Sequence, residues 1–196
     1  MTDTKEKILM TALHLFARDG YEAVSVSTIS GELGMTKGAL YKHYKNKRDI
    51  FDSIVERMFE IDAERSKQYQ VPEGQECRQS VSWDSIRQFT VAQYIFWTQD
   101  DFAQSFRKML SLEQYRNEEM AQLYHSCIVT GPVDYMEGIF AKMISDGMMK
   151  TVDPKLLALE YYAPMFLLIS SSDHLDKEQS FALLKEHIDN FISEHT

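Results

Sequence analysis

The sequence of 196 residues predicts an all-α protein with about nine to ten helices. Three observations support this fold class. Apolar residues recur along nearly the whole chain at the three-to-four-residue spacing of one helix face. Glycine, proline and polar clusters interrupt that pattern at short intervals, as connections between helices do. Runs that alternate apolar and polar residues, which are typical of strands, are almost missing.

The first two helices have clear end signals. The N-terminal helix carries its apolar residues on one face and ends at Gly20, which can adopt a positive φ. The second helix covers about 26–33, with Ser25 as the N-cap and Gly34 as the residue that ends it. Ile29 and Leu33 of the second helix, together with the first helix, are expected to receive the packing of the third.

The third and fourth helices follow after short turns. Thr36 is the expected N-cap of a third helix that reaches about Tyr44. Asn46, with Asp49 in the first turn, opens a long fourth helix that ends before the loop-like stretch 70–80.

The remainder of the chain predicts helices only. We expect breaks at 99–101, at Gly131-Pro132, at 147–153 and at 170–173. The helices between these breaks are expected at 81–98, 102–110, 112–129, 133–147, 154–171 and 176–194.

Charge separates two modules. Residues 1–50 carry a net charge of +2, and the remainder carries −11. The stretch 36–48 holds five cations and no carboxylate. Because an acidic body repels a polyanion, this basic stretch is where one can approach. We therefore predict two modules, 1–48 and 49–196, of which the first can meet a polyanion.

The second and third helices, joined by a tight turn, predict a helix-turn-helix whose second helix enters the major groove. Leu40 and Tyr44 share one face of that helix and are expected to pack inward. Lys37, Tyr41 and Lys42 lie elsewhere on the cylinder and can face outward.

Other classes of protein are disfavoured. No run approaches the roughly 18 apolar residues of a membrane span, and the first residues are too charged for a secretory signal. Cys77 and Cys127 are far apart and form no paired motif. The histidines and serines show no metalloprotease or nucleophile-elbow spacing. We expect a cytoplasmic protein that is not an enzyme, with no catalytic residue, metal or cofactor and no membrane partner.

The stretch VSVSTISGELGMTKGALYKHYKNKRDIF, at 24–51, resembles the DNA-binding signature of the tetracycline-repressor (TetR) family of bacterial regulators. The resemblance implies a helix-turn-helix DNA-binding domain over 1–48 and a ligand-binding and dimerisation domain over 49–196. It implies a homodimer that binds a palindromic operator in double-stranded DNA. It also implies a repressor that is released when a small molecule binds the C-terminal bundle. An activator or a co-repressor-dependent regulator of the same fold is the alternative. A non-specific architectural protein fits the acidic C-terminal part poorly.

The resemblance also assigns roles within the basic stretch. Base reading falls on Lys37 and Gly38, and Ala39 can touch a thymine methyl group. Lys42 is an outward-facing cation of the same helix. Phosphate contacts are implied for Ser25, Ser27, Thr36, Tyr41, His43 and Lys47.

Two further sets of residues are predicted in the C-terminal part. Aromatic and methionine side chains suggest an apolar effector pocket, which fits a lipophilic cationic ligand because the surroundings are acidic. The predicted lining is Trp97, Phe106, Met109, Tyr124, Tyr162 and Phe166. The last two helices are implied as the dimer interface, through Leu156, Leu159, Phe181, Leu184, Ile188 and Phe191.

Overall fold

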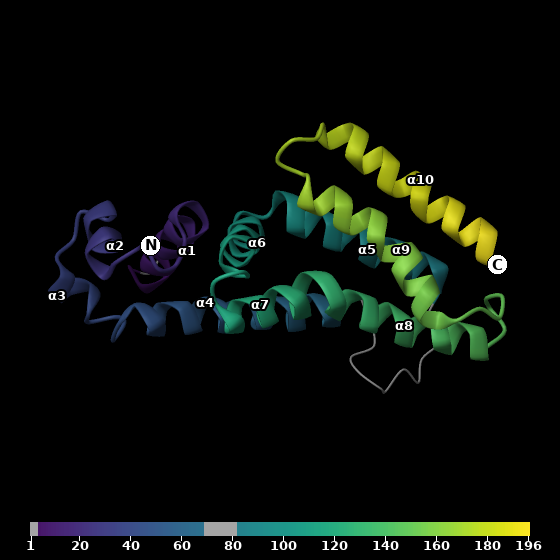
Figure 1. The fold of residues 1–196 in the computed structure, drawn as a ribbon, viewed down its shortest axis with the longest axis horizontal. Helices are drawn as coiled ribbons and strands as arrows, with labels where there is room; N and C mark the ends of the chain where they lie inside the picture. The colour runs from purple at the N-terminus through teal and green to yellow at the C-terminus, as the bar shows by residue number, and fades with distance from the viewer. Residues whose placement is uncertain (1–3, 69–81) are drawn as a thin grey trace. The chain divides into compact units, whose positions relative to one another are not determined.

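The computed structural model describes residues 4–68 and 82–196, and every regular element in them is helical (Figure 1). The all-α prediction is confirmed. The predicted loop at 70–80, with Cys77, lies outside the described residues. The elements are α1 (Thr4–Asp19), α2 (Val26–Glu32), α3 (Lys37–Leu40), α4 (Lys47–Gln68), α5 (Trp83–Gln99), α6 (Asp101–Glu113), α7 (Glu118–Tyr124), a π-helical segment (His125–Val129), α8 (Thr130–Ser145), α9 (Pro154–Ser170) and α10 (Lys177–His195). None of the helices described is both long and apolar enough to cross a membrane.

Contacts divide the chain into two units, and neither is continuous in sequence. The N-terminal unit combines Met1–Glu64 with Asp100–Tyr124, and the C-terminal unit combines Arg65–Gln99 with His125–Thr196. Helices α6 and α7 therefore belong with the first four helices, although they follow α5 in the chain. The functional boundary predicted at residue 48 coincides with the start of α4 and stays a prediction.

In the N-terminal unit, α1 supplies the centre of the core. Its residues Ile8, Ala12, Leu13 and Phe16 have no exposed surface. Helix α6 packs along α1. His14 on α1 also reaches Asp101 at the start of α6, with 2.8 Å between Nε2 and Oδ2. The apolar stripe predicted for α1 is thus covered from two sides, by α2 and by α6.

In the C-terminal unit, α5, α8, α9 and α10 enclose an aromatic core. Phe140 on α8, Tyr161 on α9 and Phe191 on α10 meet with ring centroids 4.9–5.5 Å apart. The Tyr161 hydroxyl pairs with the Thr90 hydroxyl of α5 at 2.8 Å. Burial raises the pKa of Tyr161 to about 12.

The helix break predicted at Gly131-Pro132 is wrong. The chain stays helical from α7 into α8, because the π-helical segment precedes this pair and both residues lie in the first turn of α8. Proline is tolerated in a first turn, and a π-segment adjusts the bonding ahead of it. A Cβ on Gly131 would overlap the carbonyl oxygen of Ser126, so the pair is built into the helix and does not end it.

Candidate nucleic-acid interface

The α2–turn–α3 unit is fixed by caps at each junction. The Ser25 side chain accepts the Thr28 N–H, and the Thr28 hydroxyl accepts the Ser25 N–H, which together form a capping box. Gly34 has φ +62°, and Met35 N–H donates to the Ser30 carbonyl across the turn. Thr36 then caps α3 by accepting the Ala39 N–H at 3.2 Å. The predicted capping residues Ser25 and Thr36 are confirmed.

Helix α3 is shorter than predicted and continues as turns. It covers Lys37–Leu40, and the N–H groups of Lys42 and His43 donate to carbonyls three residues earlier. Its inward side is set by Leu40, which is fully buried. The Tyr44 ring is also buried, and its hydroxyl donates to the Lys5 carbonyl at 3.3 Å. The inward packing predicted for both residues is confirmed.

The opposite side of this segment faces outward. Lys37, Gly38 and Lys42 are exposed, and Tyr41 has 51% of its surface exposed. A tyrosine this exposed beside two lysines offers an O–H donor and two cations to an approaching anion. Their roles in base and phosphate contacts stay predictions.

The other predicted phosphate-binding residues differ in their exposure and in the hydrogen bonds that they already make. Ser25 and Thr36 use their oxygens as helix caps, and a hydroxyl that accepts one bond can still donate another. Ser27 is exposed in the first turn of α2. His43 is half-buried, and Ala39 is half-buried beside the exposed Gly38.

Lys47, for which a phosphate contact stays a prediction, interacts with its own chain. Its ammonium donates to the Tyr21 carbonyl at 2.8 Å and sits 4.1 Å from the centroid of the Tyr21 ring. Only 23% of its side chain is exposed. The ammonium is therefore bound to the α1–α2 turn of its own chain.

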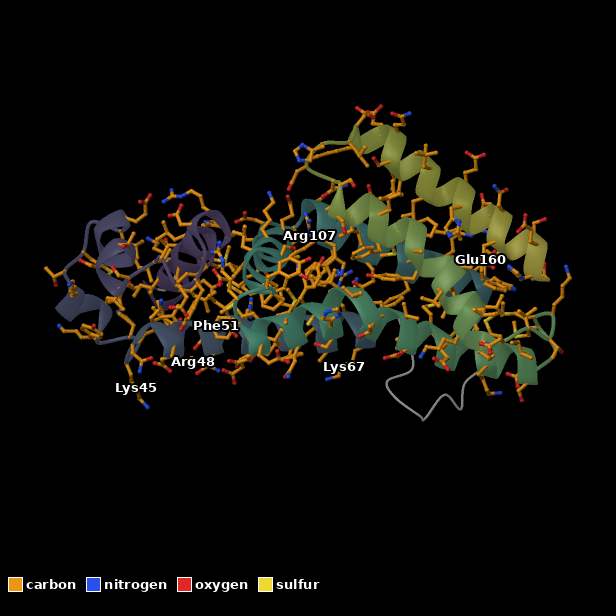
Figure 2. The ribbon with its side chains drawn as sticks, viewed as in Figure 1. Lys45, Arg48, Phe51, Lys67, Arg107 and Glu160 are labelled. Carbon is orange, nitrogen blue, oxygen red and sulfur yellow. The ribbon has the colours of Figure 1, made fainter. Side chains whose placement is uncertain are left out.

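Arg48, the next residue, is held by carboxylates. Its side chain is labelled in Figure 2. The guanidinium makes a two-pronged contact with Glu119 of α7, with both N···O distances 2.6 Å, and a third bond to Asp52. These bonds raise the pKa of Arg48, and the same guanidinium lowers the pKa of Glu119. Arg48 thus ties the start of α4 to α7.

The sequence did not predict a further contact, which joins the α1–α2 turn to α6. Glu113 is 1% exposed, and its Oε1 accepts the Tyr21 N–H at 2.9 Å. The sequence carries no signal for this bond, because the two residues are 92 positions apart. Only the folded chain could identify that partner.

The predicted pocket residues do not fall in one unit. Phe106, Met109 and Tyr124 belong to the N-terminal unit, and Trp97, Tyr162 and Phe166 belong to the C-terminal one. Phe106 and Met109 are fully buried, and the Tyr162 hydroxyl donates to the Ile128 carbonyl. A pocket shared by all six stays a prediction.

The dimer prediction needs a correction. Leu184, Ile188 and Phe191 are at most 2% exposed within one chain, because they pack into the core with α8 and α9. Phe181 is half-buried and stacks on Tyr94. None of the three fully buried side chains can reach a second copy.

A different face of the last helices is open. Leu156 and Leu159, predicted at the interface, are exposed, and Leu167 on α9 and Leu183 on α10 are 63% and 50% exposed. Helix α9 is therefore apolar on its core side and on its outer side.

Comparison with known proteins bears on this segment. Residues 8–54 match the model for bacterial regulatory proteins of the tetR family. The match runs from α1 into α4 and includes the capped α2–turn–α3 unit. The resemblance seen in the sequence is confirmed over these residues.

Curated relatives also match over a short part of the chain. The chain is 39% identical over 56 residues to the uncharacterised HTH-type transcriptional regulator YerO of Bacillus subtilis, covering 29% of this chain and 19% of YerO. It is 41% identical over 54 residues to the HTH-type transcriptional regulator AcrR of Shigella flexneri, covering 28% and 25%. The matches thus span a quarter or less of these two proteins.

The whole fold matches solved structures. The complex of SmeT with triclosan, SmeT being from Stenotrophomonas maltophilia, superposes with a TM-score of 0.66 at 20% identity. The match covers 98% of this chain and 91% of that one. At this identity the likeness establishes the architecture alone.

Proposed function

We propose that this chain is a DNA-binding transcriptional regulator of the TetR family that represses from a palindromic operator. The observation that carries the proposal is the outward face of α3. Lys37 of α3 and Tyr41 and Lys42 of the turns that follow it are exposed there, on a segment whose start is capped by Thr36, within a chain of net charge −9. An acidic protein that presents cations on one such segment is suited to meet a polyanion at that point.

Each side chain on this face has a proposed role. Lys37 donates to guanine O6 and N7, Gly38 allows close approach of the backbone, and Ala39 touches a thymine methyl group. Tyr41, Lys42, His43, Thr36, Ser25 and Ser27 bind phosphates. Phosphate contacts fix the register on the duplex, so base preference depends on the first three positions.

A symmetric dimer suits such an operator. We infer that two copies pair through the exposed outer faces of α9 and α10, which carry Leu156, Leu159, Leu167 and Leu183. An apolar helix face left open to water is a typical association site. A two-fold dimer would present two α3 helices to half-sites one helical turn apart, about 34–36 Å, or a multiple of that distance.

A small molecule is proposed to release the repressor. The described part of the C-terminal unit buries no charged side chain, and its buried polar residues are Thr90, Thr98 and Ser180. This interior favours a lipophilic effector and does not favour the cationic one expected from the acidic sequence, because an isolated cation needs a buried partner. SmeT, of the same fold, is described as the repressor of a multidrug efflux pump and was solved with triclosan.

The test is selection of bound fragments from random DNA at about 0.15 M salt, roughly physiological ionic strength. The parent chain runs beside a Lys37→Ala/Tyr41→Ala variant. We expect the parent to enrich a palindrome and the variant to enrich none. Equal enrichment by both would remove α3 as the reading element. Sequence-tolerant coating of DNA would indicate the architectural class, and activation of a reporter by the recovered operator would replace the repressor assignment.

A further inference from the structure

Helices α9 and α10 bring together three side chains of the kinds that bind metal ions. Glu160, labelled in Figure 2, comes from α9, and Glu194 and His195 come from the last turn of α10. One carboxylate oxygen of each glutamate and one imidazole nitrogen all lie within 4.8 Å of one another. Within the described ranges, this is the only group of three histidine, cysteine or carboxylate side chains with such spacing. The sequence shows no metal motif here, because Glu160 and His195 are 35 residues apart.

The spacing fits a single metal ion. Zinc binds imidazole nitrogen and carboxylate oxygen at about 2.0–2.2 Å, so neighbouring ligand atoms in a tetrahedral site lie about 3.4 Å apart. Nε2 of His195 and Oε1 of Glu160 already face each other at 3.1 Å. Both glutamate side chains are exposed, and a shift on the order of 1 Å brings all three ligand atoms to the tetrahedral separation.

The last turn of α10 is fixed in place, although helix ends usually fray. Lys150, in the connection before α9, donates its N–H to the His195 carbonyl and its ammonium to the Glu194 carbonyl. The His195 ring packs on the ring of Phe191, with 4.5 Å between centroids, and Phe191 lies in the core. Only 15% of the His195 side chain is exposed. The imidazole is therefore held beside the two carboxylates by contacts that need no ion.

The charge of the group favours a divalent cation. Two carboxylates this close repel each other, and an ion of charge +2 would neutralise both. The group keeps a net negative charge with a neutral imidazole, even when the nearby Lys150 ammonium is counted. A simple hydrogen-bonded pair accounts for the contact of His195 with Glu160, but it does not account for Glu194 beside them.

We propose that Glu160, Glu194 and His195 form a binding site for a divalent transition-metal ion of the Zn²⁺ type. One nitrogen and two oxygens are ligands that zinc accepts, and water would fill the fourth position. An imidazole ligand argues against Mg²⁺ and Ca²⁺, which prefer oxygen ligands. A bound ion would join α9 to the end of α10 and stabilise the C-terminal unit against unfolding. The site does not depend on the proposed DNA-binding function.

Calorimetric titration of the full chain with ZnCl₂ tests the site. Glu160→Gln, Glu194→Gln and His195→Ala each remove one ligand, and circular dichroism checks that each variant keeps its helices. We expect the parent to bind one ion at this site. Loss of a group that merely orients a ligand costs about 10–100-fold in metal affinity, so each variant should weaken binding at least tenfold. No binding by the parent, or parent-like affinity in any of the three variants, would overturn the proposal.

His14, in the N-terminal unit, supplies the matched control. Its Nε2 lies 2.8 Å from Oδ2 of Asp101, and in the part of the chain that the structure describes no third ligand joins this pair. His14→Ala should bind zinc like the parent. Zinc should raise the melting temperature of the parent and of His14→Ala, and it should leave that of His195→Ala unchanged. Loss of binding in His14→Ala, or an equal rise in His195→Ala, would place the ion elsewhere and overturn the proposal.

Discussion

The hydroxyl of Tyr162 on α9 donates a hydrogen bond of 2.6 Å to the main-chain carbonyl of Ile128 in the π-helical segment. Four residues after Ile128 stands Pro132, which has no N–H, so the regular helix bond to that carbonyl cannot form. Ile128 is buried, and water cannot replace the missing donor. Tyr162, predicted as pocket lining, thus has a structural role in supporting an unbroken helix.

Tyr162→Phe should therefore lower the free energy of unfolding by about 1–3 kcal/mol, because it removes a donor from a buried carbonyl and keeps the ring. Urea unfolding followed by circular dichroism measures the change. Tyr115→Phe is the control, since that side chain is 89% exposed and should leave stability within about 0.5 kcal/mol. Equal stability of parent and Tyr162→Phe would show that the bond contributes nothing net.

Gly31 in α2 offers a stabilising change. A Cβ at this position would meet no atom within 4 Å, and its φ is not positive. Gly31→Ala should raise the free energy of unfolding by about 0.5–1 kcal/mol through reduced backbone entropy of the unfolded chain. Gly34→Ala, at φ +62°, should do the opposite. Thermal unfolding of both variants and the parent measures these changes. A lower melting temperature for Gly31→Ala would show that the site does not accept a Cβ.

The Arg48–Glu119 pair predicts a dependence on pH. Arg48 lowers the folded-state pKa of Glu119 below its ordinary value of 4.5. The stabilisation is therefore complete above that value and is lost as pH falls through the lower folded pKa. Both side chains are about half exposed, so the contribution should stay below about 1 kcal/mol. The stability difference between parent and Glu119→Gln, measured from pH 7 to pH 3, should shrink toward zero. Glu118→Gln serves as control, and a difference that grows on acidification would reverse the sign argued here.

A charged substitution on the exposed outer face of α9 should dissociate the proposed dimer. Leu167→Glu places a charge on a side chain that is 63% exposed within one chain, so the fold should be unaffected. If that face is buried between copies, the variant should shift to monomer in analytical ultracentrifugation. Leu112→Glu, on α6 at 45% exposure, is the matched control and should leave the assembly unchanged. Dissociation by the control alone would place the interface elsewhere.

Lys37 predicts a change in base preference. Lys37→Ala should weaken operator binding by about 1–3 kcal/mol and relax specificity at one position of each half-site. Tyr41→Phe should weaken operator and random DNA alike, because a phosphate contact carries no sequence information. Competition binding with operator and scrambled duplexes measures both ratios. An equal loss on the two duplexes for Lys37→Ala would remove its base-reading role.

Local chemistry determined much of this protein from its sequence. The caps Ser25 and Thr36 and the positive-φ residues Gly20 and Gly34 each act within a few neighbours, so their pattern alone located the helix-turn-helix. The inward face of α3 followed from helical spacing for the same reason. The match to the tetR-family model lies over that short, locally determined stretch and its flanking helices.

Tertiary structure decided what distant residues do to one another. The sequence could not show that Glu113 accepts the Tyr21 N–H, or that the Lys47 ammonium turns inward to the same residue, because these partners are 92 and 26 residues apart. It also predicted a break at Gly131-Pro132 that a donor from α9 makes unnecessary. Leu184 was predicted at an interface and lies in the core, since an apolar stripe specifies burial without specifying which surface covers it.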